Sequence, residues 1–113
     1  MHQAQLGTIA LCYMRDWLTC QCIPVGPENV ALAARIMRAA NVTQSEARAF
    51  LANPCTERIA FCFVQDLLQH QKVPAGPENK ILVARIAKVA EVDTSVAETF
   101  LTYMQNDCNV ITW

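Results

Sequence analysis

The sequence predicts an all-α protein of two tandem, homologous three-helix units, each of about 50 residues, packed with pseudo-twofold symmetry around one shared core. Residues 8–51 align with residues 58–101 at a constant offset of 50, and 21 of the 44 pairs are identical. In each copy, apolar residues recur at helical spacing between Pro, Gly and Asn breaks. The units are residues 1–53 and 54–113. Because half of a 113-residue chain buries little apolar surface alone, we expect one cooperative domain.

The first helix of each unit is predicted over residues 8–20 and 56–69. In the first unit, one face of this helix carries residues at spacings of three and four, namely Ile9, Cys12, Tyr13 and Trp17. Such spacing is typical of an amphipathic helix that packs on a core.

The second helix is predicted to run from Pro27 to Ala40, and its counterpart from Pro77 to Ala90. Both follow the same four residues, Gly-Pro-Glu-Asn. Proline is favoured in the first turn of a helix because its missing N–H has no partner there, and Glu28 favours the positive end of the helix dipole. The repeated corner is therefore interpreted as a helix start.

The third helix begins after Thr43, because Glu46 follows at the spacing of a capping box. Asp93 is expected to cap the corresponding helix of the second unit with its side chain. These helices are predicted to end before Pro54 and near Asn106. Six helices and no strands follow.

Residues 36–51 resemble the helix-turn-helix of small DNA-binding proteins, and residues 86–101 resemble it more weakly. Asn41 stands where the turn usually has glycine, and Thr43 stands at the capping position. Glu91 departs from the pattern, because glutamate is poor in a left-handed turn.

The resemblance implies that the third helix lies in a major groove of DNA. The net charge of −1 gives this idea little support, since residues 1–53 carry +1 and residues 54–113 carry −2. DNA binding would therefore depend on the first unit. Its candidate residues are Arg35, Arg38, Gln44, Ser45 and Arg48.

Two aspartates and two arginines are present in both copies: Asp16 and Asp66, and Arg35 and Arg85. A carboxylate on a largely apolar helix needs a partner. We expect structural ion pairs, formed either within one unit or across the pseudo-twofold axis.

No catalytic residue and no cofactor is predicted, because the chain lacks phosphate-binding, dinucleotide-binding and metalloprotease motifs. Cys20, Cys22 and His70 are outside candidates for a metal site, but their spacing is unusual and a fourth ligand is unassigned. The six cysteines are otherwise expected to be reduced and mostly buried.

We expect a cytoplasmic protein, because no apolar run reaches the roughly 20 residues of a membrane span and no signal peptide is evident. The apolar fraction of 53% exceeds the needs of a small core and suggests association. The sequence therefore predicts a non-enzymatic helical regulatory or interaction module that contacts a protein partner or forms a homodimer. The alternative is a DNA-binding transcriptional regulator with tandem helix-turn-helix units.

Overall fold

The computed structural model describes the backbone of residues 3–74 and 76–105, and the side chains of residues 6–74 and 76–105. Within these ranges the chain forms six α-helices and no strand, which confirms the all-α class. The helices are α1 (Gln3–Cys20), α2 (Val30–Ala40), α3 (Gln44–Ala52), α4 (Glu57–His70), α5 (Lys80–Ala90) and α6 (Thr94–Met104).

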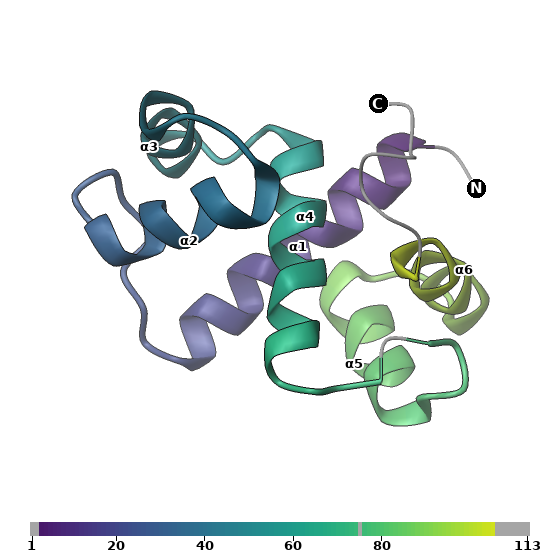
Figure 1. The fold of residues 1–113 in the computed structure, drawn as a ribbon. Helices are drawn as coiled ribbons and strands as arrows, with labels where there is room; N and C mark the ends of the chain where they lie inside the picture. The colour runs from purple at the N-terminus through teal and green to yellow at the C-terminus, as the bar shows by residue number, and fades with distance from the viewer. Residues whose placement is uncertain (1–2, 75, 106–113) are drawn as a thin grey trace.

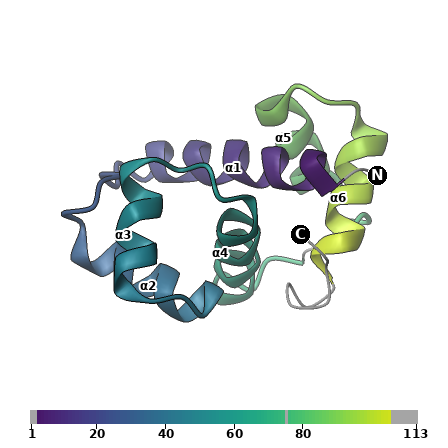
Figure 2. The ribbon, with the colours of Figure 1, turned by 90° about the horizontal axis from the view of Figure 1, so that it is seen from above.

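The longest two helices, α1 and α4, cross at the centre of the molecule (Figure 1). The pair α2 and α3 lies at one end, and the pair α5 and α6 lies at the other, as Figures 1 and 2 both show. The first helix of each half packs on the second helix of the other half, so that α1 contacts α5 and α2 contacts α4. The Cα radius of gyration is 13.2 Å, the value of about 13 Å expected for a compact domain of about 100 residues.

One apolar cluster receives side chains from all six helices. Phe61 of α4 and Phe100 of α6 are both fully buried, and their rings meet edge to face with centroids 5.9 Å apart. No polar or charged side chain is buried among the residues with described side chains. Hydrophobic burial is therefore the main force that holds the helices together.

A glycine allows α1 to approach α4 closely. A Cβ atom on Gly7 would lie far inside the contact distance of the Glu57 Cβ atom, at the first turn of α4. Because that neighbour is the root of a side chain and not its flexible end, a larger residue at position 7 would push the two helices apart.

The predicted starts of the second helices at Pro27 and Pro77 are three residues too early. Both prolines lie in a turn before the helix, and the helices begin after Asn29 and Asn79. The side-chain oxygen of Asn29 accepts a hydrogen bond from the backbone N–H of Leu32 at 3.2 Å. Asparagine is among the best N-cap residues, so its capping bond, and not the proline, sets the first residue of the helix.

The turn between α2 and α3 has the expected conformation. Asn41 adopts a left-handed backbone with φ of 55°, and Thr43 and Glu46 form a complete capping box. The hydrogen bonds from Thr43 hold the pKa of the Glu46 carboxyl below its usual value. The helix α3 ends before Pro54, as predicted.

The turn between α5 and α6 differs from its counterpart at the cap. Glu91 also adopts a left-handed backbone, with φ of 55°. The predicted side-chain cap by Asp93 is wrong, because the N–H of Val96 donates to the backbone carbonyl of Asp93 at 3.0 Å instead. The helix α6 ends at Met104, and Asn106, near which its end was predicted, lies outside the described residues.

Glu91→Gly is expected to stabilise the protein by about 0.5–1 kcal/mol, because a left-handed backbone is costly for glutamate and free of strain for glycine. Urea denaturation measures the change. The control is Asn41→Gly, whose gain should be smaller because asparagine tolerates the same conformation. Equal gains at the two positions would contradict this explanation.

Candidate binding site between α1, α2 and α4

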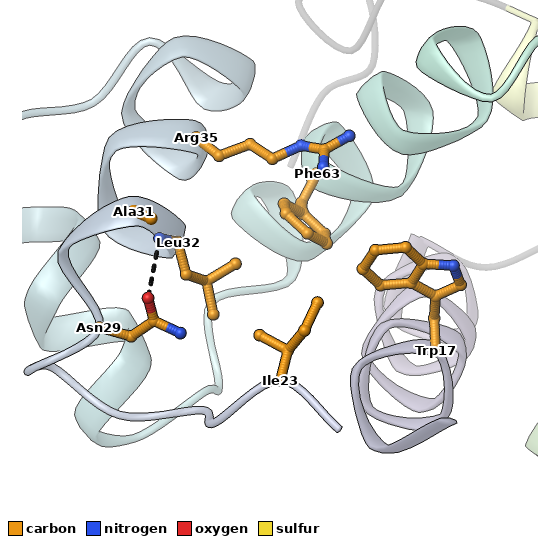
Figure 3. A pocket seen from close by; sticks show the side chains of 7 residues that line it. All are labelled: Trp17, Ile23, Asn29, Ala31, Leu32, Arg35 and Phe63. Carbon is orange, nitrogen blue, oxygen red and sulfur yellow. Dashed lines mark hydrogen bonds between the residues drawn. The ribbon is translucent and has the colours of Figure 1, made fainter. Parts of the chain in front are cut away.

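A pocket of about 260 Å³ opens to solvent where the end of α1, the following loop, the start of α2 and the middle of α4 meet (Figure 3). Four apolar side chains point toward one another there: Trp17, Ile23, Leu32 and Phe63. Asn29, Ala31 and Arg35 complete the lining. The pocket therefore has apolar walls and a single charged group at its edge.

The walls are held by contacts outside the pocket. Phe63 is fully buried in α4, and Leu32 is 6% exposed. Asn29 is fixed by two hydrogen bonds, because its Nδ2 also donates to the Pro24 carbonyl oxygen at 2.8 Å. Since these groups already have partners within the fold, the pocket is preformed.

Arg35 lies across one wall of the pocket. Its guanidinium carbon is 5.6 Å from the centroid of the Phe63 ring, within the range of a cation–π contact. Its Nε donates to the Asp66 carboxylate at 3.3 Å. The other carboxylate oxygen of Asp66 lies 3.3 Å from Nδ1 of His70, so the arginine is positioned by α4.

The corresponding residues of the other half form a second ion pair. Nε of Arg85 donates to the Asp16 carboxylate at 3.0 Å, and its Nη2 donates to the same oxygen and to Sγ of Cys20. The hydrogen bond with Asp16 raises the pKa of Arg85 above its usual value. Burial raises the pKa of the neighbouring Tyr13 phenol.

All four residues named as ion-pair candidates are thus in ion pairs, and each pair joins the two halves of the chain. Asp16 of α1 pairs with Arg85 of α5, and Asp66 of α4 pairs with Arg35 of α2. Partners 69 and 31 residues apart in sequence are brought together only by the packing of α1 on α5 and of α2 on α4.

Asp16→Asn is expected to lower the free energy of unfolding by about 0.2–1 kcal/mol, the usual range for an ion pair that is partly exposed to solvent. Thermal unfolding at low salt measures it. Asp16→Asn in an Arg85→Gln background should cost less, because the partner is already absent. An unchanged melting temperature in the single variant would contradict a stabilising role.

The DNA-binding candidates do not form one free basic surface. Gln44 and Ser45 are exposed at the start of α3, and Arg38 is exposed on α2. Arg35 is engaged by Asp66, as described above. Nε of Arg48 donates to the backbone carbonyl of Pro27 at 3.2 Å, so that side chain lies along the loop before α2.

The outside candidates for a metal site are not gathered at one point. Cys20 accepts a hydrogen bond from Arg85, in the ion pair between α1 and α5. His70 contacts Asp66, in the other ion pair, between α2 and α4. Within the described part of the chain, no group of three or more His, Cys, Asp or Glu side chains is placed to hold a metal ion.

Among the described cysteines, the expectation of reduced thiols agrees with Cys12, Cys20, Cys22 and Cys55, whereas the expectation that most cysteines are buried is wrong. Cys20, Cys22 and Cys55 are exposed thiols, and Cys12 is a half-buried thiol. Cys62 is buried, but it is disulfide-bonded. Three of the thiols are exposed because they lie near or beyond the ends of helices, where the core ends.

The pocket was not predicted from the sequence, although the alignment of residues 8–51 with residues 58–101 contains a signal for it. The pocket residues Trp17 and Ala31 correspond to Leu67 and Ile81 in the second half. At these two aligned positions the first half has a large aromatic residue where the second has a leucine, and a small residue where the second has a bulky one. Such changes in size alter the packing of one half only.

None of the described helices is long and apolar enough to cross a membrane. Comparison of the chain with protein-family models, curated proteins and solved structures finds no match. The described residues form an all-α fold with an apolar pocket beside an inter-helix ion pair.

Proposed function

We propose that the protein is a non-enzymatic interaction module whose pocket receives an apolar side chain of a protein partner. The observation that carries the proposal is the preformed pocket between α1, α2 and α4. Aromatic and aliphatic walls from which a partner would displace water are the surroundings in which a single anchoring side chain contributes most to binding. Catalysis would instead need a nucleophile or a general base directed into the pocket.

The surface beside the pocket supports this function. Val25 and Val30 are large apolar side chains that are 40% and 71% exposed. Both are close in sequence to lining residues, Val25 in the loop that carries Ile23 and Val30 directly before Ala31. A partner that covered them would bury apolar area around the anchor.

The proposal includes two homologous units related by pseudo-twofold symmetry around one core. Two observations support it. The first helix of each half contacts the second helix of the other half, and the residues of one ion pair align with those of the other at the offset of 50. Left-handed residues also occur in pairs separated by 50 positions, Cys22 with Lys72 and Asn41 with Glu91. The two units are therefore alike in their turns as well as in their helices. They differ at positions that line the pocket.

DNA binding through tandem helix-turn-helix units is the second candidate. The left-handed turn at Asn41 and the capping box at Thr43 favour it, because they give α2 and α3 the local geometry of the motif. The engagement of Arg35 and Arg48 and the acidic second half weigh against it. We therefore rank protein binding first.

Site-specific cross-linking tests the protein-binding function. Benzoylphenylalanine is placed at Ala31, on the pocket edge, or as a control at Ala52, the exposed last residue of α3. In extracts of the native cells, we expect a discrete protein adduct from position 31 and none from position 52. An adduct of twice the chain's mass would identify the partner as a second copy. No adduct, or equal adducts at both positions, would contradict the proposal.

Fluorescence anisotropy with random and genomic DNA duplexes over a salt series tests the second candidate. We expect no binding even at low ionic strength. Salt-dependent binding that Arg48→Ala weakens would favour the DNA-binding function over the pocket.

A further inference from the structure

We infer that the partner segment carries a carboxylate group next to its apolar anchor, so that the pocket takes a large side chain while the guanidinium group of Arg38 on α2 contacts the flanking acid. This inference rests on the proposed function. It adds that an acidic residue beside the anchor distinguishes the partner from a purely apolar peptide.

Three residues of α2 form a continuous edge that leads away from the pocket. Ala31, Arg35 and Arg38 are spaced by four and three positions, so they lie on one face of the helix. The first two line the pocket. Arg38 therefore places a second guanidinium group on the same face, about two helical turns from Ala31.

The charged groups around this edge leave a positive balance. The ion pair with Asp66 offsets the charge of Arg35, and His70 faces the same carboxylate. No ion pair to Arg38 occurs within the described residues. Arg48 adds a further positive charge near the loop before α2, and Glu28 in that loop adds a negative one.

Glu46, the acid of α3, adds a negative charge, but the capping box with Thr43 holds its carboxylate, and the positive charge of Arg58, which donates to the Ala40 carbonyl oxygen at the end of α2, acts on it. The capping contacts keep Glu46 on its own helix. An approaching carboxylate therefore meets the exposed Arg38, which can form charge-assisted hydrogen bonds with it.

The size of the pocket favours a side chain over a small molecule. Its volume of about 260 Å³ is below the roughly 300–1,000 Å³ of pockets that enclose a drug-sized ligand. It is large enough for one aromatic or branched aliphatic side chain. The rest of the segment would lie on the surface, where the arginines of α2 are.

Selection from a random peptide library displayed on phage tests the inference on the full-length protein. The library is first depleted on the Ala31→Glu variant, which places a charge at the pocket edge, and then selected on the wild type. We expect enriched peptides that combine one large apolar residue with Asp or Glu within about one helical turn.

The best peptide is then synthesised and its affinity measured against two matched variants. Arg38→Gln should weaken binding about threefold to tenfold, and added salt should weaken it further. Lys88→Gln is the control, because Lys88 is exposed at the corresponding position of α5 and should leave binding unchanged.

The outcomes separate this inference from the function on which it rests. If no peptide prefers the wild type over Ala31→Glu, the pocket does not bind peptides and both fail. If pocket-dependent peptides lack acidic residues, or if Arg38→Gln binds them as well as the wild type does, only the inference is overturned.

Discussion

Phe61→Ala is expected to lower the free energy of unfolding by about 3–5 kcal/mol, the range for removing a buried aromatic ring. Phe61 is fully buried, and its ring packs edge to face on Phe100. The substitution removes that pairing and leaves a cavity inside the apolar cluster to which all six helices contribute. Natural domains are stable by only about 5–15 kcal/mol, so the variant is expected to be partly unfolded near physiological temperature.

The same variant tests whether the two halves unfold together. Urea denaturation is followed by circular dichroism, which reports all helices, and by the fluorescence of Trp17 in the first half. Trp113, the other tryptophan of the chain, is replaced by phenylalanine in all samples. If the chain is one cooperative domain, Phe61→Ala shifts both transitions equally.

The control for this experiment is Ile81→Ala. Ile81 is 85% exposed, so its truncation should change stability by less than about 0.5 kcal/mol. A Trp17 transition that stays in place while the circular dichroism transition splits would show that the halves unfold independently, which would contradict a shared core.

Ala31→Glu is expected to reduce the affinity for a pocket-binding peptide at least tenfold, or by about 1.4 kcal/mol. The new carboxylate stands on the exposed edge of the pocket, where it would oppose both an apolar anchor and its flanking acid. Position 31 is in the first turn of α2, where an acid suits the helix dipole, so stability should not fall. Isothermal titration calorimetry and thermal unfolding measure the two effects.

Ile81→Glu is the matched control for Ala31→Glu. It introduces the same charge at the corresponding exposed position, in the first turn of α5. Peptide affinity should be unchanged, since Ile81 is not part of the pocket. Equal losses in both variants would indicate a general effect of charge and would contradict docking at the pocket.

Local rules predicted the helices well because they act over few residues. The spacing of Thr43 and Glu46 was sufficient to place the start of α3, since a capping box needs only four consecutive residues. The same kind of reasoning failed at Pro27, because a proline and an asparagine both suit a helix start. The helix begins after Asn29, whose side chain makes the capping hydrogen bond. At Asp93 a suitable side chain was present, but the backbone carbonyl took its place.

The ion-pair candidates were recognised from sequence, but their partners were not. Two aspartates and two arginines allow pairs within a unit or between units, and both choices satisfy the same charges. The packing of α1 on α5 and of α2 on α4 brings Asp16 to Arg85 and Asp66 to Arg35. Charge alone could not make that choice.

The amino-acid sequence by itself was enough to predict the all-α class and most helix ends, because spacing, caps and turn residues act between neighbours in the chain. The tertiary structure decided which helices meet, and it alone brought Trp17, Leu32 and Phe63 around one pocket. Those side chains come from three helices whose contacts depend on how the whole core fills its volume, and no local pattern encodes that packing.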